Sequence, residues 1–166
     1  MSEHAPWLDT ATGALRRGAF DAHTAEAVRH ARRTGQALSL VWVDVDDLLE
    51  HNDLHGREEL DRAIEWIVST LGALVDGAGP IGRVRGGAFA VLLPGADRTR
   101  ALEVSEGIRA LVSRQDHRSA WGDYRLTVSV GVASLRGGEP WGNFLEAAEA
   151  ACLRAKQGGR DGVVAR

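Results

Sequence analysis

Two aspartates one residue apart, Asp44 and Asp46, are the first side chains whose types and spacing suggest chemistry. They come at the end of the apolar run ALSLVWV, where a strand is expected to finish. Paired carboxylates can hold a divalent cation through their oxygens. Acids at a strand end also cap the turn that follows. The capping interpretation is favoured because the hairpin expected at residues 83–95 carries no further acid.

That hairpin is predicted by the segment RVRGGAFAVLLPG. Gly86 and Gly87 can adopt the positive φ angles of a tight turn, and strand-forming residues flank them. The tip offers only an arginine, two glycines and an alanine. None of these can hold a metal ion or move a proton at neutral pH, so the tip brings no catalytic group of its own.

His51 and His55 are the only pair of histidines at helical spacing. Zinc sites combine such a pair with cysteines, or with a glutamate between the histidines, and neither stands nearby. The pair therefore predicts a solvated helix face rather than a metal site.

The tryptophans divide into one core candidate and several surface candidates. Trp42 alternates with Leu38 and Leu40 along a strand, which predicts a core position. Three others lie at the margins of segments and are candidates for an exposed contact surface: Trp7, Trp121 and Trp141.

Composition limits the classes of protein that the chain can represent. A length of 166 residues with 44% hydrophobic residues suits one globular domain with its own core. The net charge of -3 is spread along the chain, which argues against a nucleic-acid surface or a membrane patch. Cys152 is the only cysteine, which excludes an intrachain disulfide and agrees with a reducing compartment.

The expected location is the cytoplasm. No apolar run is long enough for a membrane span, and the start MSEHAPWLDT has no signal-peptide core. The same sequence could equally be one piece of a larger receptor.

Periodicity and turn residues predict an alternation of helices and strands. Helices are expected over 17–33, from 56 to about 76, over 97–113 and around 145–155. Strands are expected over 37–45, on both sides of the hairpin turn, over 124–134 and, as a short edge strand, over 161–165. Over 126–133 one face carries bulky residues and the other small ones. The central order strand, helix, strand, strand, helix, strand is the split βαβ arrangement.

With this order in place, four segments resemble the GGDEF domains, the diguanylate cyclases that join two GTP molecules into cyclic di-GMP. They are DTATGALRRGAF (9–20), VDVDDLLEHNDLHGREELD (43–61), TVSVGVA (127–133) and AEAACLRAKQGGRD (148–161). The resemblance implies a lead-in over 1–8 and one domain over 9–166. It also implies an α/β (α+β) fold, with a ferredoxin-like split βαβ core and a mixed central sheet flanked by helices.

The resemblance implies that the hairpin is a degenerate form of the family signature. The family holds its metal with an aspartate, a neighbouring carbonyl and the first acid of the signature, and Asp44 and Val45 match the first two. Arg85-Gly86-Gly87-Ala88-Phe89 matches the signature, so Gly87 replaces the ligand and Ala88 the next glutamate. If Gly86 and Gly87 are aligned with the two glycines of the signature instead, Ala88 stands at the ligand position. Either register leaves no carboxylate, and magnesium would be held weakly if at all.

The resemblance also carries over a nucleotide site. Asn52 and Asp61 match the side chains that read guanine, and Lys156 and Arg160 match the pair that grips the terminal phosphates. Local roles account for the same residues: Asn52 can bond its own turn, Asp61 can pair along a helix, and the two cations can complement a helix C-terminus. Both interpretations stay open, and Mg²⁺ is expected only if a nucleotide binds.

Several positions depart from the family pattern around this site. Residues 47–49 replace His-Phe-Lys, Arg57 replaces a histidine, and Leu60 replaces a glycine, where its side chain is expected to close the base pocket. The positions matching the family's inhibitory Arg-x-x-Asp are Asp76 and Gly79. A negative charge in place of the arginine should repel cyclic di-GMP, so no tight binding is expected there.

These residues favour a catalytically inactive GGDEF-like domain that acts as a regulatory or protein-interaction module in bacterial signalling. No cofactor is then required, the expected partner is a protein, and a homodimer is compatible with the sequence. Arg83 and Arg85 are expected to be free at the hairpin tip to meet an acidic partner. Two alternatives remain: a GTP sensor without turnover, and an active diguanylate cyclase with a repositioned acid.

Overall fold

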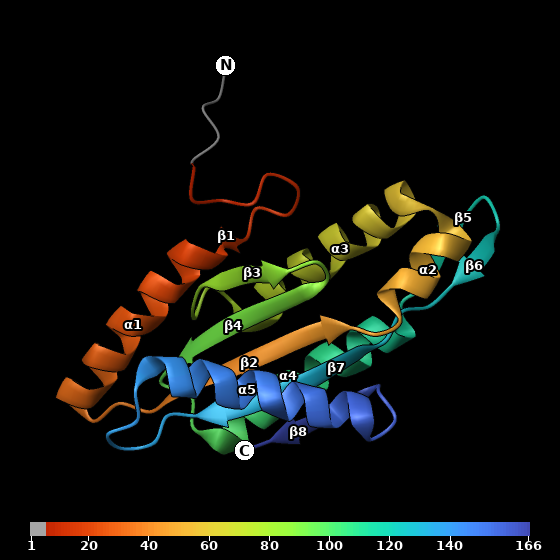
Figure 1. The fold of residues 1–166 in the computed structure, drawn as a ribbon. Helices are drawn as coiled ribbons and strands as arrows, with labels where there is room; N and C mark the ends of the chain where they lie inside the picture. Colours follow the sequence, from red (N-terminus) through yellow and green to blue (C-terminus); the bar gives the residue numbers. More distant parts are fainter. Residues whose placement is uncertain (1–5) are drawn as a thin grey trace.

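The computed structural model describes residues 6–166, which form five helices and eight strands (Figure 1). The helices are α1 (Arg17–Thr34), α2 (Leu48–His55), α3 (Arg57–Val75), α4 (Arg98–Arg114) and α5 (Trp141–Gln157). The strands are β1 (Leu15–Arg16), β2 (Leu38–Val45), β3 (Ile81–Arg85), β4 (Ala88–Pro94), β5 (His117–Ser119), β6 (Gly122–Tyr124), β7 (Val128–Ser134) and β8 (Gly162–Ala165).

Six of the strands form one mixed sheet in the order β1-β3-β4-β2-β7-β8. Strand β2 is central and runs antiparallel to both β4 and β7. The outer pairs β1–β3 and β7–β8 are parallel. The predicted split βαβ core is therefore confirmed, and the end of β2 lies between the hairpin β3–β4 on one side and β7 on the other.

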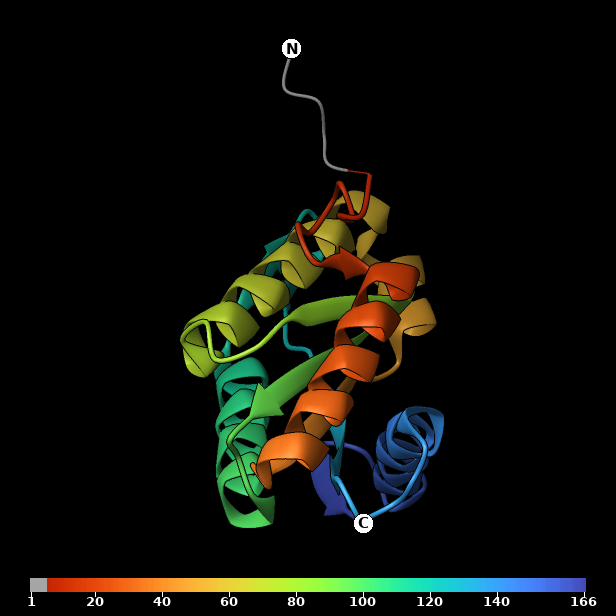
Figure 2. The same ribbon diagram turned by 90° about the vertical axis from the view of Figure 1, so that its left-hand side faces the viewer.

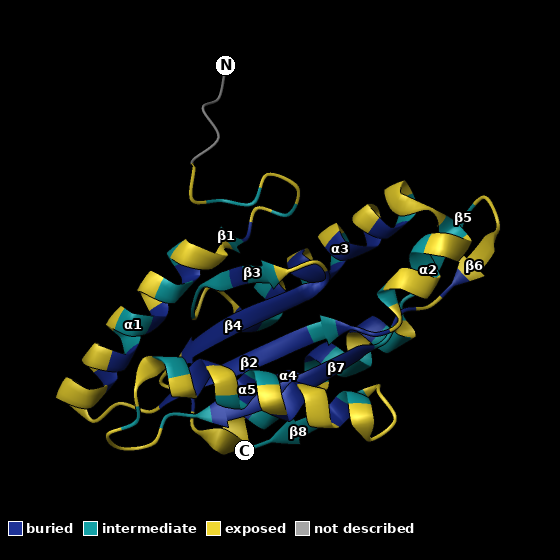
Figure 3. Ribbon diagram, in the orientation of Figure 1, coloured by how far each residue is buried: buried dark blue, intermediate teal, exposed yellow. Residues whose placement is uncertain are grey.

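Helices cover both faces of this sheet (Figure 2). One face packs against α3 and α4 in a core that includes Ile67, Ile108 and Val130. The opposite face packs against α1 and α5 around Phe20 and Phe144. Because both faces are covered, nearly every residue of β2 is buried, as the unbroken apolar run predicts (Figure 3).

Helix α5 lies unusually close to β7 because the strand face below it carries small residues. A Cβ atom on Gly131 would come within 2.0 Å of the Ala148 carbonyl oxygen and 2.2 Å of the Cys152 nitrogen. No side chain fits there, which explains the alternation of small and bulky residues in the strand. The close packing fixes the C-terminal turn of α5 beside the end of β2.

The sequence does not predict three elements of the structure: β1, α2 and the small β5–β6 hairpin. Helix α2 contains no buried residue, so it has no apolar stripe to recognise. A smaller correction concerns the hairpin turn, where Gly86 has a φ of +38° and Gly87 is outside the positive-φ region. Over residues 6–166, no helix combines the length and apolar character needed to span a bilayer.

Candidate functional site

The hairpin tip lies against the end of β2. Arg83 pairs with Phe89 and Arg85 with Ala88, and the register shifts between the two pairs. The Gly87 carbonyl accepts a hydrogen bond of 3.1 Å from the Val45 backbone N–H. The tip therefore borders the segment that carries the strand-end aspartates.

The two positions that match the signature acids are closed by their neighbours. A Cβ atom on Gly87 would lie 2.9 Å from Leu48 Cδ2 and 3.3 Å from Val45 Cβ. The Ala88 residue is 1% exposed and belongs to the core cluster that contains Trp42. A carboxylate at either position would have to displace apolar side chains or enter the core.

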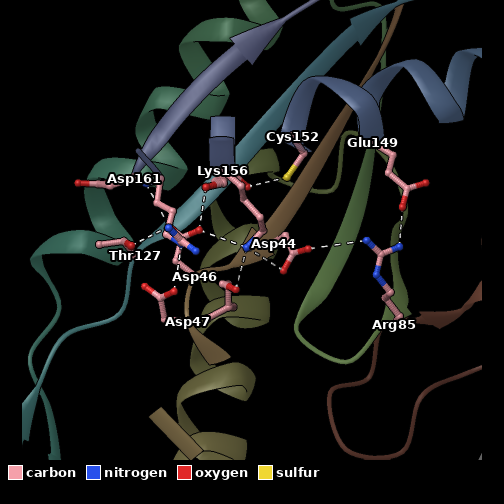
Figure 4. Close-up of polar contacts among 12 residues, drawn as sticks. Asp44, Asp46, Asp47, Arg85, Thr127, Glu149, Cys152, Lys156 and Asp161 are labelled. Carbon is pink, nitrogen blue, oxygen red and sulfur yellow. Dashed lines mark hydrogen bonds and ion pairs between the residues drawn. The ribbon is translucent and has the colours of Figure 1, made fainter. Parts of the chain in front are cut away.

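Internal cations face both carboxylate oxygens of Asp44 (Figure 4). Oδ1 is 3.4 Å from Lys156 Nζ, and Oδ2 is 3.9 Å from an Arg85 guanidinium nitrogen. Arg85 also pairs with Glu149 at 2.5 Å, and this hydrogen bond raises the pKa of the guanidinium. The charge of Asp44 is compensated by groups that belong to the chain.

Asp46 is buried and is saturated with donors. Burial by itself would raise its pKa, but the hydrogen bonds from hydroxyls and backbone outweigh burial and lower the pKa. The donors are Thr127 Oγ1 and Ser129 Oγ at 2.7 Å, the Asp161 backbone N–H at 3.1 Å and Lys156 Nζ at 3.2 Å. Asp46 thus joins β2 to β7 and to the turn after α5. The prediction that it caps the next turn is wrong.

Lys156, in the last turn of α5, points inward to the strand end. Besides the two aspartates, its Nζ lies 3.3 Å from the Val45 carbonyl oxygen, to which it donates. Its side chain is 24% exposed, so the ammonium is largely withdrawn from water. The interpretation of Lys156 as a simple complement to a helix C-terminus is therefore wrong.

Arg160, unlike Lys156, does not contact Asp44 or Asp46 and pairs with Asp47 at the surface. Its Nε lies 3.0 Å from Asp47 Oδ1, and both side chains are about half exposed. Both residues have left-handed backbone conformations, with φ of 65° and 51°. The matched phosphate-binding pair is thus divided: one cation points inward and the other is paired at the surface.

The matched base-reading residues lie on α2 and α3. Asn52 is partly buried on α2, and the Asp61 side chain on α3 is 52% exposed, with Arg57 at 3.9 Å. Leu60 is 4% exposed and belongs to the core cluster below α3. The prediction that Leu60 closes a base pocket is wrong, because its side chain faces the core.

The histidine pair is not a solvated face. His55 stacks on Tyr124 at 4.1 Å between ring centroids, and His51 and His117 stand 5.9 Å and 5.3 Å from the same ring. We call these four residues the histidine stack. Burial lowers the pKa of His51 and of His117. The stack could not be predicted from the sequence, because His117 and Tyr124 belong to the β5–β6 hairpin, far along the chain from His51 and His55.

Two ring nitrogens in the histidine stack, His51 Nδ1 and His117 Nε2, are buried without a hydrogen-bond partner. His55 Nδ1 contacts Ser119 Oγ at 3.0 Å. Within the described part of the chain, no three histidine, cysteine or acidic residues are grouped so that they could hold a metal ion.

A cavity of about 310 Å³ separates the hairpin tip from α5. Trp42, Asp44, Arg85, Cys152 and Lys156 are among its lining residues. Burial raises the pKa of the Cys152 thiol to about 12, so this thiol is not a nucleophile at neutral pH. Glu146 and Glu149 also line the cavity, and Glu149 is paired with Arg85.

The arginines of the hairpin tip are paired, which contradicts the expectation that they are free. Arg83 contacts Asp9 Oδ1 at 3.0 Å and donates through Nε to the Gly86 carbonyl. Arg85 is held by Glu149 and Asp44. The tip is tied to the opening segment on one side and to α5 on the other.

The positions matched to the inhibitory site have a backbone role. Asp76 caps α3 in the left-handed conformation, with a φ of 46°. A Cβ atom on Gly79 would lie 1.9 Å from the Leu92 carbonyl oxygen. An aspartate cannot stand at position 79 without moving β4, and position 76 offers no cation.

The predicted burial of Trp42 and the predicted exposure of three other tryptophans are confirmed. Trp42 is fully buried, although its Nε1 has no hydrogen-bond partner. The marginal tryptophans are exposed, by 57% at Trp7, 79% at Trp121 and 38% at Trp141. They are dispersed over the lead-in, the β5–β6 turn and the start of α5.

Comparison with known proteins agrees with this architecture. A family model described as "Diguanylate cyclase, GGDEF domain" matches residues 7–162. The diguanylate cyclase DgcM of Escherichia coli is 32% identical over 98% of the chain, which covers 39% of DgcM. The chain spans well under half of the curated relatives it matches, 36% for the diguanylate cyclase DosC.

Two crystal structures share the fold. The GGDEF domain of DgcB from Caulobacter crescentus, in complex with c-di-GMP, is 30% identical with a TM-score of 0.94, over 99% of this chain and 96% of that one. The diguanylate cyclase SiaD from Pseudomonas aeruginosa, in complex with its activator SiaC, is 31% identical with a TM-score of 0.91, over 98% of this chain and 62% of that one. The chain therefore belongs to the GGDEF diguanylate cyclase domains, the family of bacterial cyclic di-GMP signalling.

Proposed function

We propose that this chain is a catalytically inactive GGDEF domain that serves as a regulatory or protein-interaction module. One observation carries the proposal: the signature positions hold Gly87 and Ala88, neither of which has a carboxylate, and position 87 borders Leu48 while Ala88 lies in the core. Joining two GTP molecules requires a 3′-hydroxyl to lose its proton and an α-phosphate to gain positive countercharge. Carboxylate-held divalent metals usually supply both functions.

The residues at the strand end do not fit a divalent metal. Asp44 and the Val45 carbonyl would be the oxygen donors, and both already contact Lys156. The Asp46 carboxylate already accepts hydrogen bonds from four donors. Mg²⁺ needs near-octahedral oxygen coordination, and the second anionic ligand of the family is missing.

Two buried groups at this site are poor replacements for the lost acid. Asp46 has a lowered pKa and accepts four hydrogen bonds, so it is a poor base for a substrate hydroxyl. The Cys152 thiol is protonated and buried. Glu149 lines the adjoining cavity, but its carboxylate is paired with Arg85, so an active cyclase would first have to release it.

An interaction role suits both the surface and the relatives. SiaD, which shares this fold, is known in complex with its activator protein SiaC. In this chain Trp7, Trp121 and Trp141 expose large aromatic surfaces that a protein partner can cover. A homodimer would use the same kind of contact.

A guanine-nucleotide sensor is the second candidate. Asp61 supports it, because its carboxylate is half exposed and has only a distant ion pair with Arg57. Asn52 is retained on the adjacent helix. Such a sensor would bind GTP without turnover.

The test is incubation of the purified 166-residue chain with GTP and saturating Mg²⁺ or Mn²⁺. Separation of nucleotides should show no cyclic di-GMP above the level of a matched Asp44→Ala preparation. Cyclic di-GMP formed by the wild type and abolished in Asp44→Ala would overturn the proposal in favour of an active cyclase.

A further inference from the structure

Lys156 stands where the charges of the strand end call for a cation. Its Nζ lies 3.4 Å from Asp44 Oδ1, 3.2 Å from Asp46 Oδ1 and 3.3 Å from the Val45 carbonyl oxygen. Three oxygens from three consecutive residues thus converge on one ammonium group (Figure 4). We infer that Lys156 is the resident cation of this site and excludes a divalent metal from it. The inference rests on the proposed function, which removes the second acid.

The charges around Asp44 and Asp46 favour the Lys156 ammonium over a divalent ion at this site. Lys156 contacts both Asp44 and Asp46, and Arg85, whose nearer partner is Glu149, approaches the other oxygen of Asp44 at 3.9 Å. A divalent ion added to this arrangement would meet two positive charges at close range. Without the lysine, the Asp44 carboxylate and the Val45 carbonyl would lose their ammonium partner, while Asp46 would keep its other three donors. Oxygen donors of this kind suit Mg²⁺ or Mn²⁺.

The position of Lys156 is set by packing as well as by charge. It lies in the last turn of α5, which is held against β7 by the close approach at Gly131. Asp46 is 1% exposed and also bonds the backbone N–H of Asp161, just beyond α5. The packing of α5 on β7 at Gly131 and the hydrogen bond from Asp161 to Asp46 therefore hold the Lys156 ammonium beside the two aspartates. The Lys156 side chain is only 24% exposed.

Titration with Mn²⁺ in the absence of nucleotide tests the inference, with the free ion followed by electron paramagnetic resonance. The wild type should show no saturable binding. Lys156→Ala should bind Mn²⁺ with a Kd on the order of 1 mM or tighter, as expected for a site with few carboxylates. Adding Asp44→Asn to Lys156→Ala should abolish that binding.

Arg154→Ala is the matched control, because Arg154 is exposed on the same helix and touches neither aspartate. It removes one positive charge and should bind no Mn²⁺. If it binds as well as Lys156→Ala, the gain is a general charge effect and the inference fails. A failure of Lys156→Ala to bind Mn²⁺ would also overturn it.

If Lys156→Ala does not fold, the melting temperature of the wild type still tests the inference. That temperature should be the same in Mn²⁺ and in EDTA, whereas a Mn²⁺-dependent rise that disappears in Asp44→Asn would contradict the inference. The results of these Mn²⁺ experiments can be distinguished from the results that test the proposed function. Mn²⁺ binding without cyclic di-GMP synthesis would refute only the resident cation, and synthesis would refute the inactive domain.

Discussion

The two sides of the strand end differ in what holds them together. On the α5 side, charged groups fill the site: Asp44, Asp46, Arg85 and Lys156, which we call the charged cluster. On the α2 side, the matched base-reading residue Asn52 stands on a helix without buried residues, whose histidines contact the ring of Tyr124 in the histidine stack. The two sides therefore differ in charge compensation. Asp44 and Asp46 are paired with cations of the chain, whereas the Asp61 carboxylate on the other side stays half exposed.

The largest expected effect is the loss of Asp46 from the charged cluster. Asp46→Ala would leave four donors without their acceptor, so the free energy of unfolding should fall by about 3 kcal/mol or more. Asp53→Ala, at an exposed position on α2, should change it by less than about 0.5 kcal/mol. Urea denaturation measures both. A loss below about 1 kcal/mol in Asp46→Ala would show that the charged cluster does not hold this side together.

On the base side, Asp61 should control any guanine-nucleotide binding. Asp61→Ala removes a hydrogen-bonding partner for the base and should weaken GTP by about 1 to 3 kcal/mol, up to roughly a hundredfold in affinity. Glu58→Ala, exposed on the same helix, is the matched control. Calorimetry with GTP and ATP decides: equal binding of the two nucleotides, or no effect of Asp61→Ala, would mean that the α2 side is not a guanine site.

The histidine stack should make stability depend on pH. Burial lowers the pKa of His51 and His117 despite the nearby acids Asp47, Glu50 and Asp116, so the folded state binds fewer protons than the unfolded state. The stabilisation is complete above the unfolded pKa of about 6.5 and is lost as the pH falls below it.

Denaturation between about pH 7.5 and 5 measures this slope, above the range where carboxylates titrate. His117→Phe keeps an aromatic ring against Tyr124 and Trp66 but cannot take up a proton, so its slope should be shallower. Identical slopes in the wild type and His117→Phe would show that His117 does not cause the pH dependence of the free energy of unfolding.

The smallest expected effect is that of restoring the signature acids. Gly87→Glu together with Ala88→Glu should give little or no Mg²⁺-dependent gain in GTP affinity. Leu48 stands against position 87, and position 88 lies in the core. The comparison of affinities in Mg²⁺ and in EDTA measures the gain. A large gain would mean that the metal side is intact apart from its acids, as in a recently silenced cyclase.

Much of the fold could be predicted because its signals are local. The apolar run of β2, the stripe along α3 and the small residues of β7 each reflect one buried face. Helix α2 shows no such pattern, since none of its residues is buried and only partly buried side chains, such as Leu48 and His55, pack against the rest of the chain. The split βαβ order then follows from the sequence of the recognisable elements.

The candidate site could be predicted only in part, because its contacts join distant segments. The sequence identified Asp44 and Lys156 through the family resemblance, but their approach depends on how α5 packs on β7. Arg83 and Arg85 look free in the sequence, and only the fold brings Asp9 and Glu149 to them. Long-range ion pairs leave no periodic pattern in the chain.

Titrating GTP into the wild type in Mg²⁺ and in EDTA tests whether the cations of the chain replace a metal at Asp44. The charged cluster already compensates Asp44, so a metal should contribute nothing. We expect the same isotherm in both buffers, whether GTP binds or not. GTP binding that is at least about tenfold tighter in Mg²⁺, a difference of about 1.4 kcal/mol, would contradict it.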